Sequence, residues 1–113
     1  MRDTRAISWV KAARREFEKF PAEAQTTILA ALTIAAEGGK VDIAKPFRGV
    51  DGGVWEIALK HRGDAYRTIY AVQLGPDLIV IDAFQKKSKS GIKTPQVDVD
   101  RIRDRIKRLK ESL

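Results

Sequence analysis

Residues 54 to 84 contain three apolar runs of strand-like composition that are separated only by short turn sequences. The runs are residues 54–61 (VWEIALKH), 65–72 (AYRTIYAV) and 78–84 (LIVIDAF), and the turn sequences RGD and GPD lie between them. A parallel connection needs a dozen or more residues, so strands joined this closely run antiparallel. The sequence therefore predicts an antiparallel meander of three strands.

Helical periodicity precedes this meander. From Trp9 to Phe20 the apolar residues recur at intervals of three and four, with charged residues between them, which predicts a short amphipathic helix. Pro21 ends that helix and can occupy the first turn of a second one. The apolar face of the second helix continues from Ala24 to Ala36, and Gly38-Gly39 ends it. We expect the two helices to form a hairpin.

Three further elements complete the expected fold. Ala6 and Ile7, ahead of the first helix, alternate enough with their neighbours to add a short first strand. Residues 40–53 carry proline and several glycines and read as a connecting loop. Thr94 is a candidate N-cap with Pro95 at the first helical position, and apolar residues then recur at helical spacing to Leu113, which predicts a final amphipathic helix.

Length and composition indicate one domain, residues 1–113. A chain of 113 residues that is 43% hydrophobic can bury one core. The expected class is α+β, with an N-terminal helical hairpin packed on a small antiparallel sheet and a C-terminal helix. There is no cysteine and only one histidine, His61, so disulfides, a thiolate nucleophile and a zinc site are excluded, and no cofactor is expected. No signal-like segment begins the chain, so we expect a cytoplasmic protein with no membrane association.

The charge balance favours a polyanionic partner. There are 22 Lys and Arg against 15 Asp and Glu, a net charge of +7, although an inert basic surface would have the same composition. Four lysines, Lys86, Lys87, Lys89 and Lys93, lie in residues 84–95 (FQKKSKSGIKTP) without an acidic residue. This segment is either a solvated loop or a surface that holds an anion.

The predicted hairpin of residues 54–72 places two cations next to each other on adjacent strands. If Gly63-Asp64 is a two-residue loop, Lys60 lies opposite Arg67. Such a pair destabilises a sheet by up to ~1 kcal/mol, and an anion held between the cations would reverse that effect. A three-residue loop would instead set Arg67 opposite His61. The apolar residues of the first strand face away from these cations, so we expect the cationic face to be the open one.

The third strand should bring Lys86 and Lys87 to the same place, because its end lies beside the start of the second strand, where Arg67 is. Lys60, Arg67, Lys86 and Lys87 would then surround one concave patch. Arg67 suits the stabilisation of charge on a phosphate in a transition state. Crowding by other cations lowers the pKa of a lysine, so Lys60 or Lys87 is suited to proton transfer. Glu56, the one carboxylate on this face, is either a charge-balancing partner or a base.

Three long segments resemble a known family. They are WVKAARREFEKFP, FRGVDGGVWEIALKHRGDAYRTIYAV and AFQKKSKSGIKTP, with a helix running to EGG between the first two. Their order and spacing are similar to the phage-derived branch of the RelE/HigB superfamily, the toxins of type II toxin–antitoxin systems. GGVWEI and the YR of the second strand are the most specific parts. The resemblance covers nearly the whole chain.

This resemblance implies a small α+β toxin that cleaves mRNA without a metal, commonly on the ribosome, and is neutralised by a helix-turn-helix antitoxin from the same operon. By position it implies catalytic roles for Arg67, Lys60 and Lys87, with Lys86 beside them. RNA contacts are expected from four more residues: His61, Arg62, Lys89 and Lys93.

One departure and one alternative remain. Some RelE-type enzymes carry a catalytic tyrosine near the C-terminus, and this chain has no tyrosine after Tyr70. The general base is therefore unassigned. ParE-like members share the fold but inhibit gyrase without cutting RNA, so a non-enzymatic binding module is the alternative function. The basic segment FQKKSKSG favours the nuclease.

Overall fold

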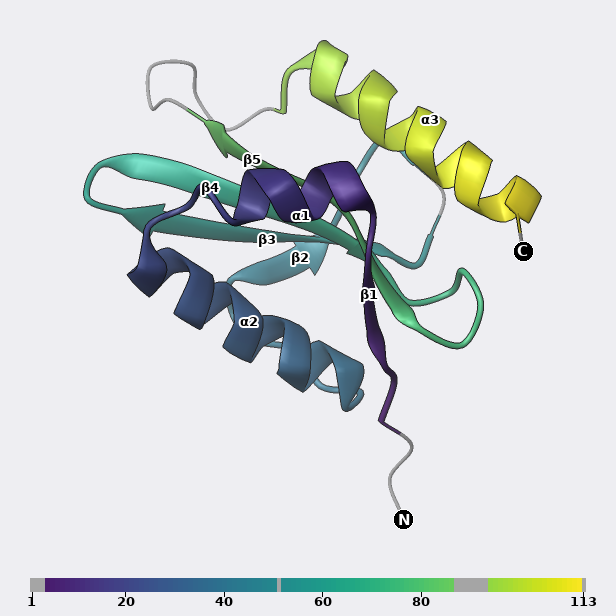
Figure 1. Ribbon diagram of the computed structural model, residues 1–113, viewed down its shortest axis with the longest axis horizontal. Coiled ribbons are helices and arrows are strands. Elements are labelled where there is room, and N and C mark those ends of the chain that lie inside the picture. Colours follow the sequence, from purple (N-terminus) through teal and green to yellow (C-terminus); the bar gives the residue numbers. More distant parts are fainter. Residues whose placement is uncertain (1–3, 51, 87–93, 113) are drawn as a thin grey trace.

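The structure is a computed structural model that describes residues 4–50, 52–86 and 94–112 (Figure 1). The described residues form five strands in one sheet and three helices. The elements are β1 (Ile7–Trp9), α1 (Lys11–Phe17), α2 (Ala22–Ala36), β2 (Ala44–Pro46), β3 (Val54–His61), β4 (Asp64–Ala71), β5 (Leu78–Lys86) and α3 (Gln96–Ser112). The strand order is β1-β5-β4-β3-β2.

The meander is confirmed. β3 pairs antiparallel with β4, and β4 pairs antiparallel with β5. The predicted first strand is also present and pairs parallel with β5. The loop predicted over residues 40–53 is wrong in part, because β2 forms within it as an edge strand on β3. An edge position tolerates Pro46, which has no N–H to donate to a further strand.

The helices begin and end near the predicted residues. The first is shorter than predicted: Trp9 belongs to β1, and Glu18 to Phe20 form a turn in which the Phe20 N–H donates to the Phe17 carbonyl. α2 buries its predicted apolar face, including Ile28 and Leu32. α3 begins one residue later than predicted, because the Pro95 carbonyl accepts the first helical hydrogen bonds. Leu113 lies outside the described residues.

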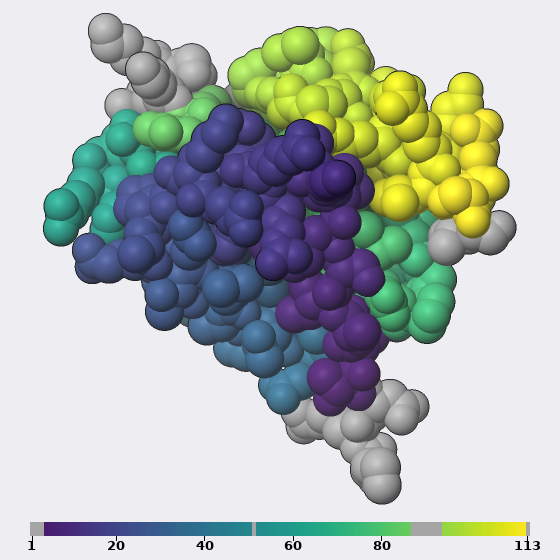
Figure 2. Space-filling model, viewed as in Figure 1, coloured from purple at the N-terminus to yellow at the C-terminus, as the bar shows by residue number. Residues whose placement is uncertain are grey.

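Helices cover both faces of the sheet. α1 and α2 lie on one face, where they bury residues such as Ile57, Tyr70 and Val80, and Figure 2 shows these two helices over that side. α3 packs on the opposite face through Ile102 and Ile106. Both N-terminal helices thus pack on the sheet; their direct pairing as a hairpin stays a prediction. None of the helices in the described part of the chain is both long and apolar enough to cross a membrane.

A bulge in β5 shapes the face under α3. Ile69 pairs with Asp82 and Tyr70 with Val80, so Ile81 is an extra residue in β5. A bulge turns neighbouring side chains toward one face. Ile81 packs in the core beneath α3, and the next residue, Asp82, also binds α3.

Asp82 holds α3 in place electrostatically. Its carboxylate is 2% exposed and accepts hydrogen bonds from the Arg101 Nε at 2.9 Å and the Arg105 Nη1 at 3.0 Å. Arg101 also binds Asp98, and these bonds raise its pKa although burial lowers it. A buried carboxylate is tolerated only when partners compensate its desolvation, so Asp82 fixes where the helix lies.

Replacing Asp82 by alanine should lower the free energy of unfolding by about 2–3 kcal/mol. This loss is at or below the lower end of the range expected when a buried ion pair is broken, because both arginines keep some contact with solvent. Urea denaturation followed by circular dichroism measures this. Asp104→Ala removes only the exposed pair with Arg108 and should cost less than about 1 kcal/mol. Equal losses in the two variants would contradict the anchoring role of Asp82.

Candidate functional site

The β3–β4 turn sets the register of the site. Arg62 and Gly63 have φ values of 51° and 85°, and His61 pairs with Asp64, so the loop is a two-residue turn of the type I′ class. The two loop residues are Arg62 and Gly63. Both predicted registers, one with a Gly63-Asp64 loop and one with a three-residue loop, are therefore wrong. Arg67 lies opposite Ala58, and neither Lys60 nor His61 faces it.

The predicted cations nevertheless share one face. The error in register is two residues, and a shift of two keeps every side chain on its own side of the sheet. Two adjacent rows cross β3, β4 and β5 on this face: Lys60, Ala65 and Lys86 form the first, and Ala58, Arg67 and Phe84 form the second. Lys60 and Lys86 therefore flank small Ala65, and Arg67 lies diagonally to both.

Arg67 makes a buried ion pair with Glu56. The Arg67 Nη1 donates to the Glu56 Oε2, and both side chains are less than a tenth exposed. The other carboxylate oxygen of Glu56 lies 3.9 Å from the Lys45 Nζ, on β2. The Arg67 Nε is buried and has no hydrogen-bond partner in the described part of the chain. Glu56 is thus the charge-balancing partner of Arg67.

Lys86 lies beside this pair at the end of β5. It is 7% exposed. Desolvation lowers the pKa of Lys86, and repulsion from the Arg67 guanidinium lowers it further, while Glu56 and Asp98 partly oppose these effects. The structure therefore brings together Arg67 and Lys86 of the predicted patch. The sequence predicted a lowered pKa for Lys60 or Lys87, whereas the lysine whose pKa is lowered here is Lys86.

The expectation that this face is open is wrong. α3 covers part of it, and Arg67, Lys86 and Glu56 are all buried. Asp82 binds Arg101 and Arg105 of α3 on this face, although sequence periodicity assigns these two arginines to solvent.

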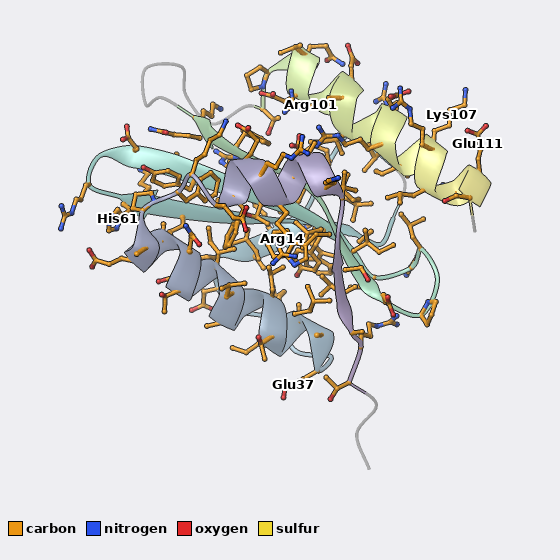
Figure 3. The ribbon with its side chains drawn as sticks, in the orientation of Figure 1. Arg14, Glu37, His61, Arg101, Lys107 and Glu111 are labelled. Atoms are coloured by element: carbon orange, nitrogen blue, oxygen red, sulfur yellow. The ribbon has the colours of Figure 1, made fainter. Side chains whose placement is uncertain are left out.

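The remaining predicted residues are spread more widely. Lys60 is exposed at the hairpin end of β3. His61 lies on the other face, with its ring 6.4 Å from that of Tyr66, and Figure 3 places it near the hairpin tip. Arg62 is exposed and pairs with Glu23 at 3.5 Å. Three predicted residues, Lys87, Lys89 and Lys93, lie outside the described residues.

Sequence reasoning missed Lys45 as a neighbour of the site. The stretch containing it was expected to be a loop because of Pro46 and the glycines that follow. The signal was only partial: Val41 and Ile43 alternate with Asp42 and Ala44, which is a period of two, but Lys45 interrupts the alternation. Within the described ranges, no three His, Asp or Glu side chains are grouped so that they could hold a metal ion.

Comparisons with known proteins agree with this fold. The model of the family described as phage derived protein Gp49-like matches residues 15–107. The toxin RelE from E. coli, solved as a mutant in the free state, is 18% identical with a TM-score of 0.64, and the match covers 93% of this chain and 97% of RelE.

A second match is the toxin–antitoxin complex RelBE2 from Mycobacterium tuberculosis, with 16% identity and a TM-score of 0.51 over 75% of this chain and 94% of the matched chain. No curated protein matches the sequence. The family match confirms the resemblance to a phage-derived family, and the two structures show that the fold is that of RelE.

Removing the Glu56 carboxylate should leave the Arg67 charge buried without compensation. We expect Glu56→Ala to lower the free energy of unfolding by about 3–5 kcal/mol, measured by urea denaturation. Glu23→Ala, which removes only an exposed pair with Arg62, is the control and should cost less than about 1 kcal/mol. A loss as small as that of the control would show that Arg67 does not depend on Glu56.

The lowered pKa of Lys86 should make stability depend on pH. The unfolded chain, in which the lysine pKa is near 10.5, binds more protons than the folded chain at pH values between the two pKa values. The free energy of unfolding should therefore rise as the pH approaches the ordinary lysine pKa from below, and this rise should be smaller in Lys86→Met. The measurements end at about pH 10, because burial raises the pKa of Tyr70 to about 12 and stability falls above the ordinary tyrosine value of 10.0.

Proposed function

Because the chain belongs to the Gp49-like family of phage-derived proteins, we propose that it is the toxin of a type II toxin–antitoxin system and cleaves mRNA without a metal ion. The fold supports this, since RelE is described as a toxin and RelBE2 as a toxin–antitoxin complex. The expected partners are mRNA, the ribosome and a cognate helix-turn-helix antitoxin. The cytoplasm is where such a toxin meets its target.

The observation that carries the nuclease is the meeting of Arg67 and Lys86 on one face. Arg67 and Lys86 lie diagonally to each other on the adjacent strands β4 and β5. Burial and then the charge of Arg67 lower the pKa of Lys86. Sheets designed only for stability avoid placing like charges together. A phosphodiester between these groups would be held by both, and its charge would relieve their repulsion.

RNA cleavage without a metal needs three catalytic contributions at the phosphate. The 2′-hydroxyl loses a proton, the phosphorane gains charge that must be stabilised, and the leaving 5′-oxygen gains a proton. Arg67 supplies the charge stabilisation with the N–H groups that Glu56 does not use. Lys86, with its lowered pKa, is suited to give a proton to the 5′-oxygen. Lys60 adds positive charge on the same face. The role of Lys87, which lies outside the described residues, is carried over from the family resemblance, and the base that takes the 2′-proton is not assigned.

Burial of Arg67 has a consequence for this reaction. Charge-assisted hydrogen bonds are stronger where water is excluded, so a phosphate that reaches Arg67 is bound more tightly than at an exposed arginine. Glu56 keeps Arg67 in one orientation before substrate arrives.

Controlled expression tests the proposal. Wild-type protein should arrest growth and create new mRNA 5′ ends, which primer extension maps, and Arg67→Lys and Lys87→Ala should each reduce cleavage by about 10²-fold or more, in the range of a lost electrostatic contact to the transition state. Arg67→Lys keeps a cation beside Glu56 and so preserves the buried pair. Lys19→Ala, a change on an exposed lysine paired with Glu16, is the matched control and should cleave normally.

Two results would overturn the nuclease. One is unchanged mRNA ends in both Arg67→Lys and Lys87→Ala. The other is growth arrest without any new mRNA ends, which would point to the ParE-like alternative and would be followed by a gyrase supercoiling assay.

A further inference from the structure

Lys45 lies at the outer edge of the Arg67 site. It belongs to β2, the end strand of the sheet, and pairs with Glu56 of β3. Cross-strand partners have their side chains on the same side of a sheet, so Lys45 is on the face that carries Glu56 and Arg67. Lys45 has no part in the reaction proposed above.

Lys45 and Arg67 contact opposite oxygens of one carboxylate. The Arg67 Nη1 donates to the Glu56 Oε2, and the Lys45 Nζ lies 3.9 Å from the Glu56 Oε1. Two cations on one carboxylate leave an excess of positive charge. The Arg67 Nε is buried and has no hydrogen-bond partner in the described part of the chain. A second anion beside Glu56 would balance the charge and would offer an acceptor to this N–H group.

Lys45 differs from Arg67 in its exposure to solvent. The Lys45 side chain is 57% exposed, whereas that of Arg67 is 8% exposed. An exposed ion pair contributes little to stability, and holding a lysine side chain in one rotamer costs entropy. Lys45 is therefore able to leave Glu56 for another anion at little cost, while Arg67 stays in place. The residue opposite Arg67 is Ala58, which is small and partly exposed, so solvent reaches the sheet beside the arginine.

The charge of Lys45 extends to the centre of the site. Burial and then Arg67 lower the pKa of Lys86, Glu56 and Asp98 oppose this effect, and Lys45 lowers the pKa further. Lys45 is two strands away from Arg67, which is roughly 10 Å across the sheet at the spacing of neighbouring strands. Because Glu56 also separates them, the two cations are placed for successive phosphates of a chain and not for a single one.

We propose that Lys45 binds the RNA phosphate next to the one held by Arg67, an inference that rests on the function proposed above. When RNA arrives, the Lys45 ammonium exchanges the Glu56 carboxylate for a phosphate oxygen. Glu56 keeps its bond to Arg67, so the orientation of the arginine does not change. Lys45 is then a substrate-binding residue that holds the RNA equally well in the ground state and in the transition state.

Lys40 provides a matched control. Its Nζ lies over the Trp55 ring, 5.9 Å from the centroid, and Trp55 packs on the side of the sheet that α1 and α2 cover. Lys40 and Lys45 are both exposed and are close in the chain, but they lie on opposite faces of the sheet. Lys45→Gln and Lys40→Gln change the net charge equally. They should weaken long-range attraction alike, so only a local contact distinguishes them.

The measurement is single-turnover cleavage of mRNA by the purified protein, with and without ribosomes, at increasing protein concentration. It gives the maximal rate and the protein concentration at half of that rate. Lys45→Gln should raise the half-maximal concentration about fivefold to tenfold and keep the maximal rate within about twofold, as expected when a contact made equally in both states is lost. Lys40→Gln should change each quantity by less than about twofold.

Salt dependence and a charge-conserving variant check the contact itself. Each phosphate contact to a single strand contributes about 0.7 to the slope of log affinity against log salt concentration. The slope should therefore be smaller by about 0.7 in Lys45→Gln and unchanged in Lys40→Gln. Lys45→Arg keeps the charge and should cleave like the wild type. Circular dichroism should show that all three variants are folded.

The other outcomes overturn the inference. Equal effects of Lys45→Gln and Lys40→Gln would show attraction at a distance without a local contact. A lower maximal rate in Lys45→Gln would show that Lys45 acts through Glu56 and Arg67 and not on the RNA. If the wild-type protein cuts no mRNA, the proposed function and the role of Lys45 both fail; if it cuts and Lys45→Gln cuts equally well, only the role of Lys45 fails.

Discussion

Helices cover both faces of a small sheet that carries buried charged side chains, among them Glu56, Arg67, Asp82 and Lys86. Burial of a charge costs several kcal/mol unless partners compensate it. Two sets of ion pairs supply this compensation: Glu56 pairs with Arg67 inside the sheet, and Asp82 pairs with two arginines of α3. The position of α3 depends on the second set.

The elements could be predicted from sequence because they depend on local periodicity. The boundaries of β3 match the prediction, and the apolar residues of α2 and α3 are those that face the core. The register between β3 and β4 could not be predicted, because Arg62 has a positive φ that its residue type does not indicate. Asn, Asp and Gly are the usual residues there, and an arginine gives no turn signal. Since the error was two residues, the face assigned to Arg67 was still right.

The burial of the site could not be predicted either. The helix on this face is held by Asp82, which meets α3 across a sequence separation of about twenty residues. A sequence pattern marks Asp82 only as a polar residue in an apolar strand, and it marks the arginines of α3 as a solvated face. The pairing of Asp82 with these arginines is a tertiary contact. In the sequence alone, Asp82 is an unfavourable residue in a buried strand, and the arginines are ordinary residues of an exposed helix face. For that reason the same residues suggested an open cationic face where the structure has a covered one.

α3 connects the two cationic regions of this face. Its first turn supplies Asp98, whose charge acts on Lys86, and its second half, with Arg103 and Lys107, lines a groove at the other end of the sheet. The two regions hold their charges differently: Arg67 and Lys86 are buried, whereas Lys107 is exposed, so salt screens the field of Lys107 more strongly. Because Asp82 holds α3 and this helix borders both regions, one buried carboxylate positions the residues that α3 contributes to each of them.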